Sequence, residues 1–285
     1  MKVFENFDLT NYNSFKIYSR CKRAFFPDSE GDIQYLFSNK KNYILLGSGH
    51  NVILSKSFYD DDFIVFNGNF SQIELAGERD IIEAQAGATM YHLSLFARDQ
   101  GLTGLEIFFD IPSSLGGAVV MNAGASGEEI KDVLLKVKYL DLETMEVDEI
   151  NKEEIGFQYR NSFFQRNTDK IILKASLKLE KGDKHKIQSK MDLIKEQRWK
   201  KQPRDLPNAG SVFKRPKGFY VGAMIDELKL KGMTRGGAKI SEKHGGFIVN
   251  YDNATGNDIL ELIAEIKRRV SERFGVDLEV EQRII

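Results

Sequence analysis

Two glycine-rich stretches decide how this sequence folds: LGSGHN at residues 46–51 and IPSSLGGA at residues 111–118. The second continues shortly afterwards into MNAGASG at residues 121–127. Backbone N–H groups bind a diphosphate at close range, and small residues let the chain approach it that closely. Two such stretches on separate segments predict a dinucleotide that is held from both sides, although either stretch alone is also typical of an ordinary turn.

Neither stretch has the spacing of a familiar nucleotide-binding motif. Gly49 is followed by His50, Asn51 and Val52, so the first stretch does not read G-x-G-x-x-G. Neither stretch ends in the Gly-Lys-Ser/Thr of a P-loop. The sequence therefore predicts a nucleotide ligand on a fold other than the Rossmann or P-loop fold.

Composition predicts a soluble globular protein. The 285 residues are 41% hydrophobic and 29% charged, which is enough for a sizeable core. Because no apolar run is long enough to span a bilayer and the first residues do not read as a secretory signal, we expect a cytoplasmic protein without a membrane partner. The net charge of −1 provides no overall basic field, so nucleic acid is not expected as a partner.

Cysteine and histidine give no sign of a metal site. Cys21 is the only cysteine, which excludes an internal disulfide and a cysteine-rich metal centre. The histidines, His50, His92, His185 and His244, include no pair with the spacing of metal ligands. We therefore expect no bound metal.

Strands and helices alternate in the first two thirds of the chain. Tyr43–Leu46 reads as a short buried strand that leads into the first glycine stretch, and residues 63–66 read as another strand. Thr89 is placed to cap a helix that runs to Gln100 and stops at Gly101.

Two further strands are expected to pair in one antiparallel sheet. Alternation of apolar and polar residues defines the inward face of each strand. The inward positions are Val133, Leu135, Val137 and Tyr139 in one strand and Leu173, Ala175, Leu177 and Leu179 in the other.

The chain becomes strongly polar at residues 180–186, and a basic helix is expected from Ser189 to about Lys200. Beyond it, apolar spacing predicts a helix at 258–274, a shorter helix near 221–228, and strands at 247–249 and 278–285. In the last strand a period of two places Glu279, Glu281 and Arg283 on one face. This order predicts a second α+β domain.

Polar residues collect in two stretches between these elements. Arg160 lies among aromatic residues, where its guanidinium is suited to a carboxylate or phosphate. Ser211 follows Gly210 and precedes the cations Lys214 and Arg215. Taken singly, each stretch also reads as a surface ion pair or a solvated basic turn.

Together these stretches resemble the UDP-N-acetylenolpyruvoylglucosamine reductases, also called UDP-N-acetylmuramate dehydrogenases, which are flavoenzymes of peptidoglycan precursor synthesis. The resemblance runs along nearly the whole chain. Its segments are NSF at 13–15, the first glycine stretch, GLE at 104–106, GEEIKDV at 127–133, YRNS at 159–162, KQP at 201–203, AGSVFKRP at 209–216, GGA at 236–238, SEKH at 241–244 and LEVEQRII at 278–285.

The resemblance implies an α+β protein of the family's shorter type. Its FAD-binding domain would be of the vanillyl-alcohol-oxidase/PCMH type, followed by a smaller α+β substrate-binding domain. Combined with the change in composition, this places an FAD-binding region at 1–182, with two α/β subdomains at roughly 1–70 and 71–182, and a substrate-binding domain at 183–285.

The activity implied by the resemblance is FAD-dependent reduction of UDP-N-acetylenolpyruvylglucosamine to UDP-N-acetylmuramate, with NADPH as hydride donor. We also expect the protein to be a monomer. One alternative is a flavin oxidoreductase of the same fold that acts on another nucleotide sugar or small substrate. A second alternative is a nucleotide-binding module without catalysis.

The resemblance also assigns roles to residues. Arg160 would bind and polarise the substrate carboxylate, Ser211 would donate a proton, and Glu281 would assist as an acid or charge-positioning group. Substrate contacts are expected from Lys214, Arg215, Tyr159 and His244. FAD contacts are expected from Gly47, Ser48, Gly49, His50, Asn51, Ser113, Ser114, Gly116, Gly117, Ala118, Asn122, Ala123 and Gly124.

The chain departs from the family pattern at several positions. The family's first loop usually reads Gly-Gly-Gly-Ser-Asn, and its second has Pro-Gly where this chain has Pro112-Ser113, so Ser113 is expected in a conformation that glycine reaches at less cost. Related flavin oxidases sometimes attach flavin through a histidine in a comparable loop. We expect His50 instead to donate a hydrogen bond to non-covalent FAD. Gln282 stands where the family has valine.

Overall fold

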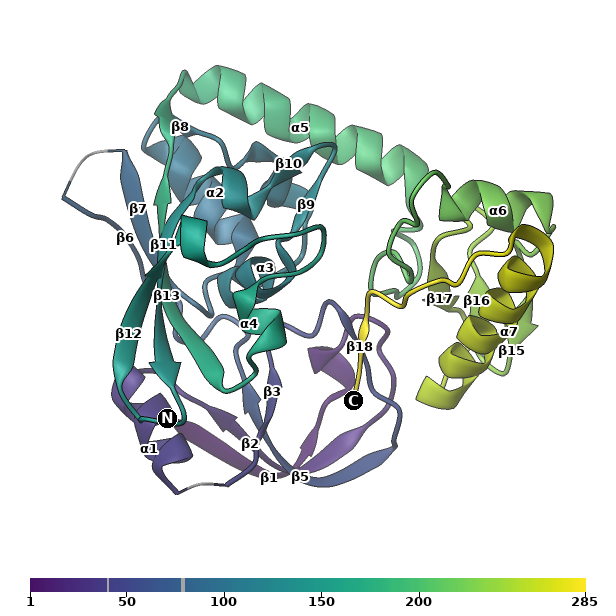
Figure 1. Cartoon of the computed structure of the whole chain (residues 1–285), viewed down its shortest axis with the longest axis horizontal. Helices are drawn as coiled ribbons and strands as arrows, with labels where there is room; N and C mark the ends of the chain where they lie inside the picture. The colour runs from purple at the N-terminus through teal and green to yellow at the C-terminus, as the bar shows by residue number, and fades with distance from the viewer. Residues whose placement is uncertain (40, 78–79) are drawn as a thin grey trace. The chain divides into compact units, whose positions relative to one another are not determined.

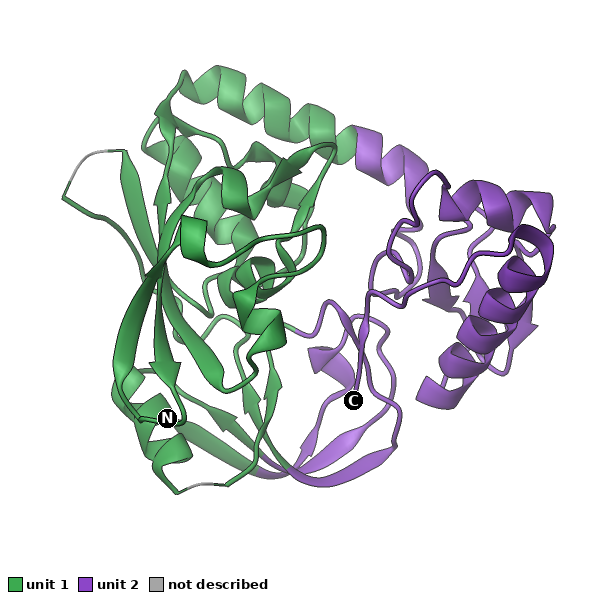
Figure 2. Ribbon diagram, viewed as in Figure 1, with its two compact units in different colours: residues 1–4, 24–48, 62–196 green, residues 5–23, 49–61, 197–285 purple. Residues whose placement is uncertain are grey.

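The computed structural model describes residues 1–39, 41–77 and 80–285, which form two compact units (Figure 2). Unit 1 comprises residues 1–4, 24–48 and 62–196, and unit 2 comprises residues 5–23, 49–61 and 197–285. The chain thus contributes three separate segments to each unit. The assignment of FAD to residues 1–182 and of substrate to residues 183–285 concerns ligands, and it stays a prediction.

The elements follow the chain as labelled in Figure 1. Four of them contain residues of both units: β1 (Lys2–Asp8), β2 (Arg20–Phe26), β5 (Phe58–Val65) and α5 (Lys184–Lys201). Unit 1 holds α1 (Glu30–Ser38), β3 (Ile44–Leu46), β6 (Ile73–Leu75), β7 (Ile81–Gln85), α2 (Met90–Asp99), β8 (Leu102–Thr103), α3 (Leu115–Met121), β9 (Gly124–Ala125), β10 (Glu128–Glu129), β11 (Leu134–Asp141), β12 (Val147–Asn151), α4 (Phe163–Arg166), β13 (Lys170–Lys178) and β14 (Glu180–Lys181). Unit 2 holds β4 (Val52–Ile53), α6 (Val221–Glu227), β15 (Thr234–Arg235), β16 (Ala238–Ile240), β17 (Ile248–Asn250), α7 (Gly256–Phe274) and β18 (Arg283–Ile284).

The main sheet of unit 1 has five antiparallel strands in the order β12-β11-β13-β7-β6. The expected pairing of the strands near residues 134 and 177 is confirmed. A second sheet has the order β1-β2-β5-β3, with β3 parallel to β5, and unit 2 contains the three-stranded sheet β15-β16-β17. This mixture of helices and sheets confirms the predicted α+β class.

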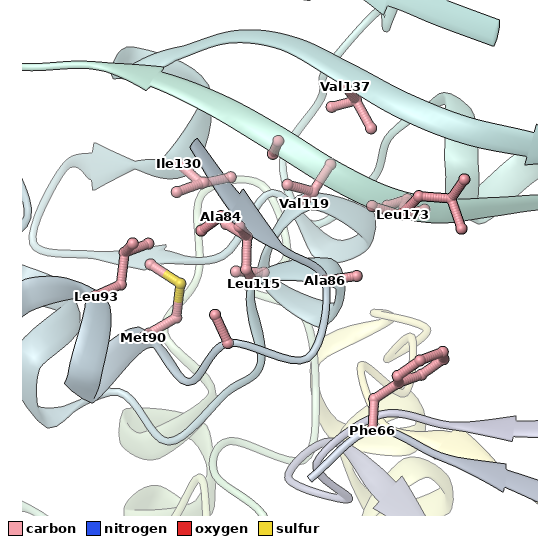
Figure 3. Packing of buried hydrophobic residues seen from close by; sticks show 14 of the residues in the cluster. Phe66, Ala84, Ala86, Met90, Leu93, Leu115, Val119, Ile130, Val137 and Leu173 are labelled. Atoms are coloured by element: carbon pink, nitrogen blue, oxygen red, sulfur yellow. The ribbon is translucent and has the colours of Figure 1, made fainter. Parts of the chain in front are cut away.

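The core of unit 1 includes buried side chains from β7, α2, α3 and β13, as Figure 3 shows for Ala84, Leu93, Val119 and Leu173. Helix α2 begins where predicted, because the Thr89 side chain accepts a hydrogen bond from the His92 backbone N–H at 3.2 Å. Helix α3, which contains the second half of the second glycine stretch, packs on β13 and β7. The glycine stretch is thereby fixed to the sheet.

The inward face predicted for β11 is wrong. Leu134, Val137 and Leu140 are buried, whereas Leu135 and Tyr139 are only half-buried. The pairing of β11 with β13 shifts register between Leu134 and Lys136 and again between Lys138 and Tyr139. Each irregularity turns the strand, so a strict period of two does not survive along it.

Helix α7 is the main helix of unit 2 and confirms its prediction closely. It starts with a capping box between Thr255 and Asp258, and it ends at Gly275, which has φ of 65°. Its buried residues are Gly256, Ile259, Leu262, Ile263, Ile266 and Val270. They pack with segments from elsewhere in the chain, including Phe15, Ile17 and Ile53.

Two predicted elements of the last third need correction. Helix α5 begins at Lys184 rather than Ser189, because the Asp183 carboxylate accepts a hydrogen bond from the Lys186 N–H at 2.9 Å and caps the helix earlier. Residues 278–285 are not one strand, since only Arg283–Ile284 forms β18 and Val280 makes an isolated bridge to Phe213. The segment changes pairing partner along its length, which interrupts the alternation.

The register shift in β11 predicts that truncating two neighbouring leucines lowers the free energy of unfolding by different amounts. Leu134→Ala removes a side chain that is 1% exposed and is expected to lower the free energy of unfolding by about 2–5 kcal/mol. Leu135→Ala, the matched control, removes the same atoms from a half-buried position and should cost clearly less. Urea unfolding of both variants measures the difference. An equal loss of unfolding free energy in the two variants, or a larger loss in Leu135→Ala, would support the strict alternation instead.

Candidate active site

The first glycine loop, residues 47–51, follows β3 and offers a run of backbone donors. Within the part of the chain that the structure describes, none of its backbone N–H groups donates a hydrogen bond. Ser48 and Gly49 are buried. Since buried N–H groups normally have an acceptor, consecutive donors of this kind suit an anion such as a diphosphate. The loop therefore fits the group that the sequence predicts there.

Gly49 cannot be replaced without moving the backbone. Its φ is 71°, and a Cβ on it would lie 1.9 Å from the carbonyl oxygen of Tyr12. The Gly49 carbonyl in turn accepts a hydrogen bond from the Ser14 N–H at 3.0 Å. Both the left-handed conformation and the close approach of residues 12–14 require glycine.

The second glycine stretch is connected to the first within unit 1. The Ser114 N–H donates to the Ser48 Oγ at 2.9 Å, and a Cβ on Gly47 would lie 3.2 Å from the Ser114 Oγ. The next N–H groups are already used, because Leu115 donates to Ala88 at 2.8 Å. Gly116 and Gly117 likewise donate to the Ala86 carbonyl and the Ser114 Oγ, at 2.9 and 3.3 Å.

The two stretches therefore differ in what they can offer a ligand. The first presents backbone donors, and the second supports the first through Ser114. Gly116 is small because it packs on Ala86, where an added Cβ would lie 3.2 Å from the Ala86 Cβ. The strained conformation expected for Ser113 is absent, since Ser113 is not among the described residues with positive φ.

Asn122 and Gly124, predicted to contact FAD, organise the chain around Arg160. Asn122 is fully buried in a left-handed conformation and donates to the Glu129 carboxylate at 2.9 Å and to the Gln158 carbonyl at 3.1 Å. Its own carbonyl and that of Gly124 accept hydrogen bonds from the Arg160 guanidinium at 3.1 and 2.6 Å. Ala123, between them, is half-buried.

Arg160 occupies a strained position in a tight turn. Gln158 and Asn161 exchange backbone hydrogen bonds at 3.0 and 3.2 Å, which leaves Tyr159 and Arg160 as the two central residues. Arg160 has φ of 53°, where glycine or asparagine is usual, and its guanidinium lies 5.2 Å from the Tyr159 ring centroid. An observed outlier of this kind at an arginine supports a functional role, because folding alone would favour glycine.

In unit 2, main-chain pairing brings Ser211 close to Glu281. Ser211 is exposed and forms an isolated bridge with Phe247. The next residue, Val212, donates to the Gly246 carbonyl at 3.0 Å and accepts from the Glu281 N–H at 2.8 Å. The segment that contains Ser211 thus lies between residues 246–247 and the segment that contains Glu281.

Asn51, at the end of the first glycine loop, is hydrogen-bonded to the Glu281 segment. Its side-chain amide donates to the Glu281 carbonyl at 3.1 Å, and its carbonyl accepts from the Arg283 N–H at 3.0 Å. The structure therefore connects a predicted FAD residue to a predicted catalytic residue inside unit 2.

His50 is held by Ser14, a residue for which the sequence motifs predict no role. The Ser14 hydroxyl and the His50 Nδ1 are hydrogen-bonded to each other. Burial, with a smaller effect from the charge of Lys16, lowers the pKa of His50 to about 4. His50 is therefore neutral at pH 7, and no local pattern could have indicated a partner 36 positions away.

The residues predicted to bind substrate have different surroundings. Lys214 forms an ion pair with Glu279 at 2.6 Å, and the Arg215 guanidinium lies 3.7 Å from the Tyr220 ring centroid. His244 accepts a hydrogen bond from the Gly246 N–H at its Nδ1, at 3.0 Å, and burial lowers its pKa. A neutral His244 in this arrangement has its proton on Nε2, where it can donate to a ligand.

Unit 2 also contains a pocket of about 520 Å³ lined by Trp199, Lys239, Lys243 and neighbouring residues. Its lining does not include Ser211, Glu281 or His244. The pocket therefore adds nothing to the assignment of the predicted catalytic residues.

Within the described residues, no helix has the length and apolar character needed to cross a membrane.

The fold and the two glycine loops define a flavoprotein class. Residues 22–147 match the family model described as an FAD binding domain, which agrees with the loop donors at residues 47–51. The α+β architecture is thus that of an FAD-binding domain with a further domain after it.

The chain belongs to the UDP-N-acetylenolpyruvoylglucosamine reductase family, as its sequence predicts. Residues 202–285 match the model described as the C-terminal domain of that reductase. The reductase of Francisella tularensis is 39% identical over 99% of both chains, and that of Caldanaerobacter subterraneus is 40% identical over all of this chain and 94% of its own. The crystal structure of the reductase from Thermus caldophilus superposes with a TM-score of 0.83 at 30% identity, covering 99% of this chain and 98% of that one.

The close approach at Gly49 predicts a substitution that the fold does not tolerate. Gly49→Ala adds both left-handed strain and a clash with the Tyr12 carbonyl. Gly68→Ala is the matched control, because Gly68 has φ of 81° with nothing within 4 Å of an added Cβ. We expect Gly68→Ala to cost about 1 kcal/mol and Gly49→Ala clearly more in thermal unfolding, with loss of bound FAD only for Gly49→Ala. Similar costs would show that conformation alone accounts for Gly49.

The lowered pKa of His50 makes stability depend on pH. His50 takes up a proton near pH 6.5 when unfolded and only near pH 4 when folded, so the free energy of unfolding falls as the pH is lowered through this range. We expect the unfolding temperature to fall between pH 6.5 and 4, and to fall less in His50→Asn. His244 contributes in the same direction, so the variant keeps part of the decrease. Identical pH profiles for the two proteins would refute the neutral, buried state of His50.

Proposed function

We propose that this protein catalyses the FAD-dependent reduction of UDP-N-acetylenolpyruvylglucosamine to UDP-N-acetylmuramate, with NADPH as the hydride donor, in peptidoglycan precursor synthesis. Membership of the reductase family along nearly the full chain is the observation that carries this proposal. The presence of Arg160, Ser211 and Glu281, with the last two on hydrogen-bonded segments, supports it.

FAD fits the first glycine loop, where backbone N–H groups of residues 47–51 would hold its diphosphate without a covalent bond. When bound, the flavin supplies the chemistry that accepts a hydride from NADPH and passes it to the substrate. Ser48 and Ser114 keep the second glycine stretch against this loop. Neutral His50, held at its Nδ1 by Ser14, would present its other ring nitrogen as a donor.

Arg160 would bind the carboxylate of the enolpyruvyl group. Hydride addition at the terminal carbon moves negative charge into this carboxylate, and a guanidinium stabilises that charge as it develops. Hydrogen bonds to the carbonyls of Asn122 and Gly124 orient the guanidinium before substrate arrives. Such preorganisation avoids rearrangement during the reaction.

Ser211 would then protonate the neighbouring carbon of the enolate. A serine hydroxyl is a weak acid, so this step needs a strongly basic enolate and a site from which water is excluded. Glu281 would assist as an acid or by positioning charge, and its N–H bond to Val212 keeps its segment beside that of Ser211.

The remaining predicted contacts suit a nucleotide sugar. Lys214 and Arg215 would neutralise phosphate, and Tyr159 and His244 would donate hydrogen bonds from a phenol and a neutral imidazole. We further propose that the enzyme works in the cytoplasm as a monomer and binds neither nucleic acid nor membranes, which the net charge of −1 supports.

An anaerobic absorption experiment tests the proposed function. The purified protein, loaded with FAD, is reduced with NADPH and then mixed with UDP-N-acetylenolpyruvylglucosamine. We expect the oxidised flavin bands to disappear and then to return when the sugar is added. Flavin that is reduced but stays reduced would exclude this substrate, and a protein that cannot take up FAD would exclude the cofactor.

Replacement of the proposed proton donor should separate binding from catalysis. Ser211→Ala is expected to retain FAD and its reduction by NADPH, and to lower turnover of the enolpyruvyl sugar by about 10²-fold or more. Ser189→Ala, on the exposed surface of α5, serves as the control and should leave turnover unchanged. Turnover that survives in Ser211→Ala would remove Ser211 from the mechanism.

A further inference from the structure

Gln282 has a buried carboxamide to which the proposed reaction gives no role. Its side chain is 4% exposed, and its Nε2 donates to the Ala209 carbonyl at 2.9 Å. Its Oε1 has no hydrogen-bond partner in the part of the chain that the structure describes. Burial of a carboxamide with an unpaired oxygen costs free energy that an apolar side chain of similar size would avoid. Stability of the core alone therefore does not explain a glutamine here.

The hydrogen bond from Gln282 acts on the loop that contains Ser211. Gln282 holds the Ala209 carbonyl, and the N–H of the preceding residue, Glu281, holds the Val212 carbonyl at 2.8 Å. The two bonds lie on either side of the dipeptide Gly210-Ser211. They connect both of its ends to one short segment.

Without the Gln282 bond, the loop has fewer restraints against the Glu281 segment. Gly210 has φ of 81°, and a Cβ on it would meet nothing within 4 Å, so packing around it is sparse. Other contacts do hold the loop: the Gly210 N–H donates to the Asn208 Oδ1 at 3.1 Å, and Ser211 pairs with Phe247. These contacts fix the loop to residues 208 and 247. After Ser211, the Glu281 N–H bond to Val212, the bridge between Phe213 and Val280, and the Lys214 N–H bond to the Glu279 carbonyl at 2.9 Å join the chain to the Glu281 segment. Before Ser211, the bond from Gln282 to the Ala209 carbonyl makes this connection.

We propose that Gln282 is a positioning residue for the protonation step, because its carboxamide holds the Ser211 loop in register with the segment that contains Glu281. The proposal rests on the proposed function, in which Ser211 donates a proton to the substrate. Gln282 acts through Ser211 and does not itself touch the reacting atoms. Its effect is therefore confined to the step that uses Ser211.

Because only one step depends on Ser211, the proposal predicts different effects on the two half-reactions. Reduction of bound flavin by NADPH needs no proton from Ser211, whereas reduction of the enolpyruvyl group does. Loss of the Gln282 bond should slow the second half-reaction and leave the first unchanged. A purely structural residue would instead affect both half-reactions through loss of folded, FAD-loaded protein.

The test uses Gln282→Met in the full-length, FAD-loaded protein, because methionine has a similar length and no hydrogen-bond donor. Stopped-flow absorption follows flavin reduction by NADPH and flavin re-oxidation by UDP-N-acetylenolpyruvylglucosamine separately. We expect reduction within about twofold of wild type and re-oxidation slower by about 10-fold or more, without a comparable change in half-saturation by the sugar. Gln188→Met, on α5, is the matched control and should change neither rate.

A double variant provides the second criterion. If Gln282 acts through Ser211, Ser211→Ala/Gln282→Met should be no slower in re-oxidation than Ser211→Ala alone. Multiplicative losses in the double variant would overturn the proposal, as would equal losses in both half-reactions of Gln282→Met or no loss in either.

Gln282→Asn keeps the test decisive if the methionine variant does not fold. Its carboxamide is one methylene shorter and cannot make the same bond to Ala209, so the same split between half-reactions is expected. Wild-type rates in Gln282→Asn would overturn the positioning role. Failure of the wild-type flavin to be re-oxidised by the sugar would instead overturn the proposed function, which keeps the two failures distinct.

Discussion

The close packing of residues 49–51 between two distant stretches of chain is the constraint on which unit 2 depends. On one side, Gly49 lies against the Tyr12 carbonyl and accepts a hydrogen bond from Ser14. On the other side, Asn51 is hydrogen-bonded to the main chain of Glu281 and Arg283. A loop whose backbone donors suit a diphosphate is thus built into the same framework as the proposed catalytic glutamate. Any larger residue at position 49 would force the loop and residues 12–13 apart.

Lys214 and Arg160, two positively charged candidate residues, have different hydrogen-bond partners. Lys214 is paired with the Glu279 carboxylate, so part of its charge is already balanced before a ligand binds. Arg160 donates to the carbonyl oxygens of Asn122 and Gly124, which orient its guanidinium. A guanidinium that is oriented before a ligand binds is suited to stabilising charge that develops during a reaction. This orientation agrees with the proposal that Arg160 binds the substrate carboxylate.

The features that the sequence predicts correctly depend on residues that are close together in the chain. The cap at Thr89 and the apolar stripe of α7 depend on residues within a few positions of one another, and the structure confirms both helices. The irregular register of β11 and the broken strand at residues 278–285 depend on partner strands, which no single segment specifies. The site divides in the same way. The glycine loops and the candidate residue types could be identified from the sequence. The Ser14–His50 bond and the Gln282–Ala209 bond could not, because they join residues 36 and 73 positions apart.

Unit 2 is built from three separate segments of the chain, which affects when it can fold during translation. The buried cluster of this unit combines Phe15 and Ile17, from near the amino terminus, with Ile53 and with residues up to Leu278. During translation, Phe15 and Ile17 can contact Leu278 only after the segment that contains Leu278 has left the ribosome. A fragment limited to the last third would lack these side chains and leave their apolar contacts open to water. The core of this unit therefore forms only after residues 197–285 have been synthesised.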